Sequence, residues 1–145
     1  MQAQLSHPAY RRELGGGLVL RWSTSADTAA IGQLYGFVFR DKAEDPLNHI
    51  MMAWERDLMS GRNPLIGPGD FAVVEDTDGG AIVAATCLLR QTWEYEGIAF
   101  PVGRPEIVAT MPEYRNRGLI RAIFELIHAR GDWPITSDKQ VVGEI

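Results

Sequence analysis

Three arginines gather around one glycine at the predicted start of a helix. Residues 112–131 read PEYRNRGLIRAIFELIHARG, which places Arg115 and Arg117 before Gly118 and Arg121 after it. The first turn of a helix presents unpaired backbone N–H groups and the positive end of the helix dipole. Positive side chains there destabilise the helix by ~0.3–1 kcal/mol each. An anionic ligand reverses this balance, because a phosphate accepts hydrogen bonds from the amides and pairs with guanidinium groups.

Gly118 fits the same prediction, since a residue without a Cβ lets a bulky anion approach the backbone closely. A plainer interpretation stays open: the arginines are solvated, and the glycine serves close packing alone. Neither G-x-x-x-x-G-K-[ST] nor G-x-G-x-x-G occurs in the stretch, so it does not predict a generic nucleotide-binding loop.

A strand and a helix are expected early in the chain. Residues 18–22 (LVLRW) have the composition of a short strand. Thr24 and Asp27 form a predicted capping box, and apolar residues spaced by three and four predict a helix that continues to Val38.

A second helix is expected to begin at Asp45, as N-cap, with Pro46 at the first helical position. Gly61 is expected to end it. The apolar face of this helix is predicted to contain Leu47, Ile50, Met51, Trp54 and Leu58.

The middle of the chain predicts strands. Residues 71–75 and 81–90 are strand-like, and Asp78-Gly79 between them indicates a hairpin. Residues 91–104 predict a wide connection, because Gly97 and Pro101 interrupt the pattern. Residues 105–111 predict a strand near the middle of a covered sheet, since both faces look apolar.

The last predicted helix carries an apolar stripe and ends near Gly131, and a short strand is expected around QVVGEI at the end of the sequence. The order of elements predicts an α/β layered domain with a mixed, mainly antiparallel central sheet flanked by helices. Consecutive strands argue against a doubly wound parallel fold.

Composition narrows the classes of function. The chain has 145 residues, of which 46% are hydrophobic, enough for one domain with a real core. A net charge of -5 argues against a general nucleic-acid binder. No apolar run approaches the ~20 residues that span a bilayer, so we expect no membrane partner and a reducing, cytoplasmic location.

The residues that most often bind metals or act as nucleophiles are sparse. Cys87 lies among aliphatic residues and is expected to be a small buried hydrophobe rather than a catalytic thiol. The three histidines, His7, His49 and His128, are too scattered to predict a metal site, so no metal is expected.

At the arginine cluster the sequence resembles a known family. VATMPEYRNRGLIRAIFELI is similar to the acetyl-CoA binding motif of the GNAT superfamily of N-acetyltransferases, whose consensus is Arg or Gln, two residues, Gly, one residue, and Gly or Ala. Ile120 replaces the usual small residue, as in the enhanced-intracellular-survival branch, which the stretch PVGRPEIVATMPEYRNRGLIRA also resembles. The resemblance covers roughly residues 18–131. The positions that match the motif are Arg115, Asn116, Arg117, Gly118 and Leu119.

The resemblance implies acetyl-CoA as the co-substrate. The strand carrying Val108, Ala109 and Thr110 would separate from its neighbour and pair its main chain with the pantetheine arm, like an added strand. Amides from Arg115 to Leu119 would hold the diphosphate, with the two loop arginines supplying positive charge.

The resemblance also implies that parts of the family pattern are missing. Family members continue with a full strand, a helix and a tyrosine that protonates the CoA thiolate, so we expect a fragment that lacks the C-terminal strand and helix. Residues 1–17 are expected to be a flexible N-terminal segment, and residues 18–145 a partial acetyl-CoA binding domain. Glu106 is a candidate general base, but an ion pair with Arg104 is the favoured interpretation. No catalytic residue is assigned.

Two functions follow from these expectations. The first is an acetyltransferase that acts on a primary amine, carried by a small molecule or a peptide. The second is a non-catalytic module that binds CoA, or binds a partner or a second copy through an open sheet edge. An unrelated α/β domain with a solvated arginine turn is the third alternative.

Overall fold

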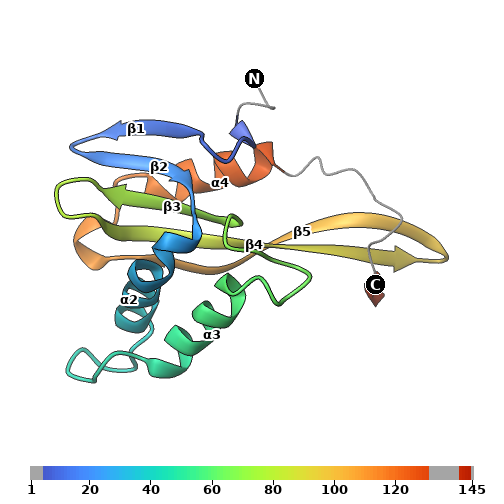
Figure 1. Ribbon diagram of the computed structural model, residues 1–145, viewed down its shortest axis with the longest axis horizontal. Coiled ribbons are helices and arrows are strands. Elements are labelled where there is room, and N and C mark those ends of the chain that lie inside the picture. Colours follow the sequence, from blue (N-terminus) through green and yellow to red (C-terminus); the bar gives the residue numbers. More distant parts are fainter. Residues whose placement is uncertain (1–4, 131–140, 145) are drawn as a thin grey trace.

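One mixed sheet organises the protein. The computed structural model describes residues 5–130 and 141–144. Five strands are antiparallel neighbours in sequence order, and a sixth pairs in parallel with the fourth (Figure 1). This confirms the predicted mixed, mainly antiparallel sheet and a short strand near the C-terminal end. The strands are β1 (Arg11–Gly15), β2 (Leu18–Trp22), β3 (Phe71–Asp76), β4 (Ala81–Tyr95), β5 (Ile98–Thr110) and β6 (Val141–Glu144).

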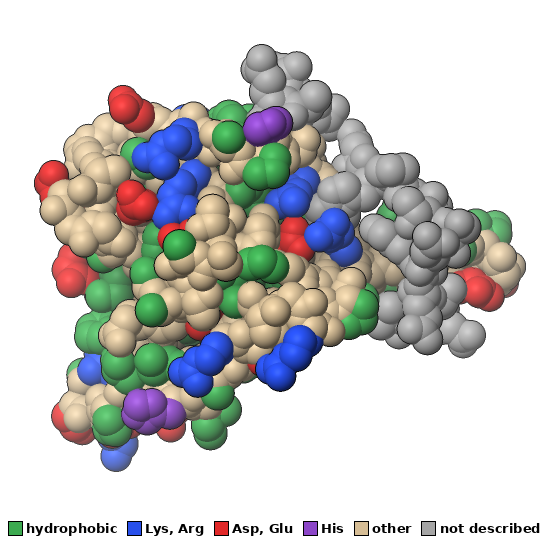
Figure 2. Space-filling model, in the orientation of Figure 1, with side chains coloured by type: hydrophobic (Ala, Val, Ile, Leu, Met, Phe, Trp, Pro, Cys, Tyr) green, Lys and Arg blue, Asp and Glu red, His purple; other side chains and the backbone are tan. Residues whose placement is uncertain are grey.

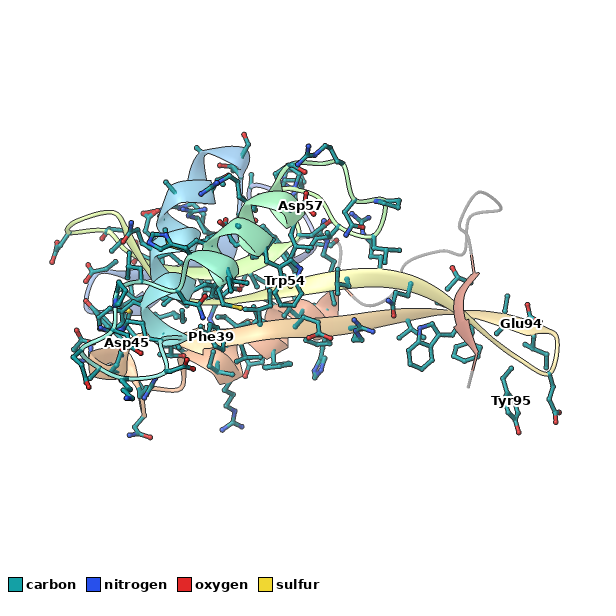
Figure 3. All side chains as sticks on the ribbon, turned by 90° about the horizontal axis from the view of Figure 1, so that it is seen from below. Phe39, Asp45, Trp54, Asp57, Glu94 and Tyr95 are labelled. Carbon is teal, nitrogen blue, oxygen red and sulfur yellow. The ribbon has the colours of Figure 1, made fainter. Side chains whose placement is uncertain are left out.

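Helices cover both faces of the sheet. α2 (Thr28–Val38) and α3 (His49–Met59) lie on one face, and α4 (Leu119–Ala129) lies on the other (Figures 1 and 3). Two single turns of 3₁₀ helix, η1 (Ser25–Asp27) and η2 (Pro112–Tyr114), precede α2 and the loop to α4. The result is the α/β layered fold that the sequence predicts.

Each face of the sheet buries its own apolar core. On the α2 and α3 side the core centres on Tyr35, Phe71 and Leu58. On the α4 side it centres on Trp22 and Leu20, against the α4 side chains. The predicted apolar stripe of α4 is confirmed, because all five of its residues are buried: Leu119, Ala122, Ile123, Leu126 and Ile127.

The predicted capping box lies at the start of η1, the turn that leads into α2. The Thr24 amide donates to Asp27 Oδ2 at 2.8 Å, and both halves of the predicted capping box are present. The hairpin between β3 and β4 is also confirmed, although the residue with positive φ is Gly80, at 75°, rather than Asp78 or Gly79.

Residues near the N-terminus differ from the expectation of a flexible segment. Arg11–Gly15 forms β1, which pairs antiparallel with β2. The indole of Trp22 donates to the carbonyl of Leu5 at 2.8 Å. The strand is almost wholly exposed, so its sequence carries no apolar alternation that could have predicted it.

The helix α3 begins later than predicted and buries a different face. Asn48 is the N-cap, and its side chain accepts from the Met51 amide at 3.1 Å. Ile50, predicted to be buried, is 82% exposed, and Trp54 is exposed as well. Leu58 is buried as predicted, whereas Glu55 and Met59 are buried in place of Ile50 and Trp54.

The wide connection predicted for residues 91–104 is wrong. These residues continue β4 and β5 as one long hairpin that projects beyond the helices, with Tyr95 near its tip (Figures 1 and 3). Tyr95 pairs with Ile98, and the two turn residues Glu96 and Gly97 have φ of 49° and 80°. Positive φ at both turn residues matches the right-handed twist of the strands, so Glu-Gly here acts as Asn-Gly does elsewhere.

The strand predicted for residues 105–111 exists, but it does not lie in the middle of the sheet. It is the second half of β5, the last strand in the antiparallel order. Among the strands that the structure describes, β5 pairs with β4 alone. Within the described residues its second edge is therefore open.

The surface charge is mixed on the face viewed in Figure 2, where Lys and Arg side chains lie among Asp and Glu side chains. Within residues 5–130 and 141–144, no helix is long and apolar enough to cross a membrane.

Candidate functional site

A β-bulge interrupts β5 just before its end. Ala109 pairs with Ala85 and Glu106 pairs with Cys87, so Ile107 and Val108 together lie opposite one residue of β4. Ile107 has a φ of 53°, which is rare for a β-branched residue. Bulges bend a strand and leave the extra residue outside the ladder of hydrogen bonds. The bulge therefore bends β5 near its end, and the other edge of this strand has no partner among the described strands.

Side-chain directions change at the same place. Val108 is 44% exposed, whereas Ile107 and Ala109 on either side of it are buried. Thr110, partly buried, ends the strand. Of the three residues predicted to contact the pantetheine arm, Val108 is thus part of the bulge, and Ala109 and Thr110 follow directly after it.

The loop between β5 and α4 alternates in handedness. Asn116 and Gly118 both have positive φ, 63° and 74°, and Arg117 between them does not. Such an alternation turns successive backbone N–H groups toward one concave side, an arrangement that binds anions. Gly118 is the N-cap of α4 and provides no side-chain cap, so the first amides of the helix lack a cap acceptor.

A hollow of about 400 Å³ lies between this loop and the end of β5. We call it the strand hollow. It is lined by the predicted residues Val108, Ala109, Thr110, Arg115, Asn116, Gly118 and Leu119, and also by Val38, Tyr114, Ile120 and Arg121. Ile120, the position that departs from the family consensus, lines the hollow without closing it.

Arg117, the remaining predicted residue, lines a neighbouring hollow of about 330 Å³. We call it the basic hollow. It is lined by Arg12, Leu14, Gly15, Gly16, Leu18, Arg117, Gly118, Leu119, Arg121, Ala122 and Glu125. The two hollows share Gly118, Leu119 and Arg121, so they meet at the start of α4.

The loop arginines donate to main-chain carbonyls. Arg115 Nε donates to the carbonyl of Thr110 at 3.2 Å, and Arg117 Nη2 donates to that of Glu113 at 3.1 Å. The guanidinium of Arg117 lies 5.1 Å from the ring centre of Tyr114. Both side chains are exposed and free to turn toward a ligand.

Tyr114 anchors the loop to the body of the protein. Its hydroxyl donates to Asp76 Oδ2 at 2.6 Å, and this bond lowers the pKa of Asp76 and raises that of Tyr114. The tyrosine thus holds the loop against the turn between β3 and β4, and its hydroxyl proton is engaged there.

The predicted ion pair of Glu106 and the predicted burial of Cys87 are both present in the structure. Arg104 Nε lies 2.8 Å from Glu106 Oε1, the ion pair that was the favoured interpretation of Glu106. Cys87 is buried, and burial raises the pKa of its thiol to about 12, which favours the neutral thiol of a small buried hydrophobe. His7, His49 and His128 are all exposed.

Glu55 is a polar group that sequence reasoning missed. It is 1% exposed, and Oε1 has no hydrogen-bond partner among the described residues. Burial raises the pKa of Glu55 to about 7, with a smaller opposing effect from Arg56. Gly32 makes room for it, because a Cβ there would lie 3.0 Å from Glu55 Oε2. The sequence signal was Glu55 falling at helical spacing between Met51 and Met59.

Tyr35 is a second buried polar group on this side of the sheet. Its hydroxyl lacks a hydrogen-bond partner in the described part of the chain. Burial, and next the nearby Cys87 and Glu55, raise its pKa well above the ordinary value. Across residues 5–130 and 141–144, no group of three or more His, Cys, Asp or Glu side chains could hold a metal ion.

Comparison with known proteins shows which family the sequence and the fold resemble. The sequence matches the model of the acetyltransferase (GNAT) domain over residues 20–131. No curated protein matches it closely enough to count as a relative. Among solved structures, an acetyltransferase from Trypanosoma brucei is 23% identical, with a TM-score of 0.52 over 88% of this chain and 80% of that chain.

Two further structures of similar fold were solved in complex with a coenzyme A derivative. N-myristoyltransferase from Saccharomyces cerevisiae with bound myristoyl-CoA has a TM-score of 0.66 at 12% identity, over 84% of this chain and 28% of that one. AAC(6')-Iy, in complex with the bisubstrate analogue CoA-S-monomethyl-acetylneamine, has a TM-score of 0.53 at 12% identity, over 88% of this chain and 77% of that one. At these identities the likeness concerns the fold.

Proposed function

Since the chain belongs to the GNAT acetyltransferase family, we propose that it binds acetyl-CoA in the strand hollow and transfers the acetyl group to a primary amine. The observation that carries the proposal is that the main chain of a strand edge and the main chain of an anion-binding loop both border the strand hollow. The open edge of β5 after the bulge forms one side, and the anion-binding loop before α4 forms the other.

In this proposal the strand and the loop hold different parts of the same molecule. Val108, Ala109 and Thr110 pair their main chain with the pantetheine arm, in the manner of an added strand. The amides from Arg115 to Leu119 hold the diphosphate, and the guanidinium group of Arg115 neutralises part of its charge. Both roles use backbone atoms, which explains why side-chain types in the strand are so ordinary.

The reaction is a direct transfer. The neutral amine nitrogen attacks the thioester carbonyl carbon, the C–N bond forms, and the C–S bond breaks. The amine loses one proton, and the CoA thiolate takes one up. A main-chain N–H at the bulge is suited to stabilise the oxyanion, and alignment of the two reactants contributes ~7 kcal/mol or more.

The class of acceptor is a primary amine. AAC(6')-Iy, which shares this fold, was solved with an analogue that joins CoA to acetylneamine. The residues of this chain do not indicate one amine within that class. Acceptor specificity is therefore measured with a panel of small-molecule and peptide amines. Its assignment to the enhanced-intracellular-survival branch rests on residues 101–122 and stays a prediction.

Calorimetric titration with acetyl-CoA tests the proposal first. We expect a saturable heat and an increase in melting temperature, because a ligand that binds only the folded state stabilises it. Release of free thiol from acetyl-CoA is then measured over the panel of amines. Absence of both heat and thermal shift would remove the proposal.

One observation favours the second candidate, a module that binds CoA without catalysis. Within the described residues, Glu106 is occupied by Arg104, and the Tyr114 hydroxyl is occupied by Asp76. Among the described residues that line the strand hollow, Tyr114 is the one candidate general acid or base, and its hydroxyl already donates to Asp76. Firm CoA binding without thiol release for any amine would select this candidate.

A further inference from the structure

The basic hollow has a chemistry that the proposed function does not use. We propose that Arg12, Arg117 and Arg121 bind the 3′-phosphate on the ribose of coenzyme A there. The inference rests on the proposed function, since it assigns the nucleotide end of the same ligand. It adds β1, which sequence analysis had placed in a flexible segment, to the binding site.

Charge is the first reason. Three arginines from three different elements line the basic hollow, and Glu125 is the one acidic residue among its lining residues. Arg12 Nη1 lies 3.0 Å from Glu125 Oε2, and Arg121 Nε lies 3.9 Å from Glu125 Oε1. One carboxylate therefore pairs with two guanidinium groups. The three arginines and one glutamate leave the hollow with a net positive charge, which a phosphate dianion would balance.

The position of Arg121 is the second reason. It lies in the first turn of α4, where a positive charge opposes the helix dipole, and no acidic residue occupies that turn. Arg117 precedes the same turn. Neither residue stabilises the helix by its charge, so a ligand explains them better than the fold does.

The order of groups along the ligand is the third reason. The two hollows meet at Gly118 and Leu119, where the proposed function places the diphosphate. The pantetheine arm must follow the strand edge, since only the strand hollow is lined by β5. The other end of the molecule, the nucleoside with its phosphate, is then directed to the basic hollow.

The turn between β1 and β2 leaves room for that group. Gly15 and Gly16 line the basic hollow, and no atom lies within 4 Å of a Cβ built on either residue. Their φ values of 91° and 61° are ones that other residues rarely adopt. The turn thus presents bare backbone on one side of the hollow and Arg12 on the strand beside it.

Calorimetry with CoA and dephospho-CoA, at one fixed salt concentration, tests the inference. We expect the protein to bind CoA about tenfold more tightly than dephospho-CoA. The substitutions Arg12→Gln and Arg121→Gln should each reduce that ratio about three- to fivefold, as expected for exposed charge pairs, and leave the affinity for dephospho-CoA nearly unchanged. The triple variant with Arg117→Gln should show no preference.

Two variants control for long-range charge. Arg11 precedes Arg12 on β1, is exposed, and does not line the basic hollow, so Arg11→Gln should keep the preference for CoA. Glu125→Gln should increase it, because the carboxylate competes with the phosphate for two arginines. Circular dichroism checks that each variant is folded.

The outcomes separate the two proposals. Equal binding of CoA and dephospho-CoA by the unmodified protein overturns this inference and leaves the proposed function standing. So does a preference that Arg11→Gln lowers as much as Arg12→Gln does. Failure of both nucleotides to bind removes the proposed function, and the inference with it.

Discussion

Arginines in this protein occupy two contrasting environments. Arg21 on β2 is 11% exposed, and its guanidinium donates to Asp27 at 2.8 Å through both terminal nitrogens and to Glu75 at 2.8 Å. Arg115 and Arg117 before α4 are exposed and donate to main-chain carbonyls. The first environment is complete without a ligand, whereas the second has donors in excess of acidic acceptors.

The pKa directions agree with this contrast. Hydrogen bonding to Asp27 raises the pKa of Arg21 despite its burial. Burial alone would raise the pKa of Asp27, but the bonds from Arg21 and Thr24 outweigh it and lower the value. The buried pairing of Arg21 with two carboxylates thus indicates a structural role, whereas the exposed guanidinium groups of Arg115 and Arg117 donate to carbonyl oxygens and are accessible to a ligand.

The largest change in the free energy of unfolding is expected for a substitution of Arg21. Arg21→Met leaves two partly buried carboxylates without their partner and should lower the free energy of unfolding by about 3–5 kcal/mol. Denaturation in urea measures it. Arg62→Met is the matched control, because the pair of Arg62 with Asp57 is well exposed and should contribute less than about 1 kcal/mol. Similar losses in the two variants would contradict the contrast.

Glu55 extends the comparison to a buried acid without an arginine. Its raised pKa, about 7 against 4.5, means that the folded state holds the proton more tightly than the unfolded state does. Stability should therefore fall as pH rises from about 4.5 to 7 and level off above, by a total of about 3 kcal/mol. Glu55→Gln should abolish most of that decline, measured by urea denaturation across pH. An unchanged pH profile would show that the carboxyl is solvated or paired.

Arg115 tests the other environment. Arg115→Gln should weaken CoA and dephospho-CoA alike, by about tenfold, because its proposed partner is the diphosphate that both share. Calorimetry measures both affinities, with Arg62→Gln as a distant control. The stability of the unliganded protein should stay within about 0.5 kcal/mol. A loss confined to CoA would move Arg115 to the ribose phosphate.

The smallest effect is expected at Arg121, with the opposite sign to Arg21. Arg121→Gln removes a positive charge from the first turn of α4, so the unliganded protein should be as stable as before or more stable by about 0.3–1 kcal/mol. Thermal unfolding without ligand measures it. A marked loss of stability would mean that Arg121 belongs with Arg21 as a structural residue.

Local chemistry made the loop and its helix predictable from the sequence. The apolar stripe of α4, the capping box at Thr24 and the strand before the loop all depend on neighbours within a few residues. Residues 108–110 line the strand hollow, and their contact with a pantetheine arm stays a prediction. The basic hollow was not predictable, because Arg12 reaches Glu125 across 113 positions of sequence.

The misplaced elements have other causes. Sequence reasoning assumed that charged residues face water, so it put Trp54 rather than Glu55 on the buried face of α3. It also took Gly97 and Pro101 as breaks, although a two-residue turn needs Gly97, and Pro101 lies on an edge strand where proline is tolerated. The first error arose because a carboxyl group is buried, and the second because Glu-Gly forms a turn that more often contains Asn-Gly.

The extra residue in β5 has a consequence for the evolution of this strand. Before it, the less exposed side chains fall at even positions, such as Phe100 and Val102, and after it they fall at odd positions, Ile107 and Ala109. A deletion of one residue there would restore regular alternation. It would also move the side chains of the projecting β4–β5 hairpin to the opposite faces relative to the rest of the sheet. Natural variants should therefore change the length of this hairpin at its Glu96-Gly97 tip, by one residue on each strand. Such a change keeps the paired strands in register and leaves the faces of the remaining side chains unchanged.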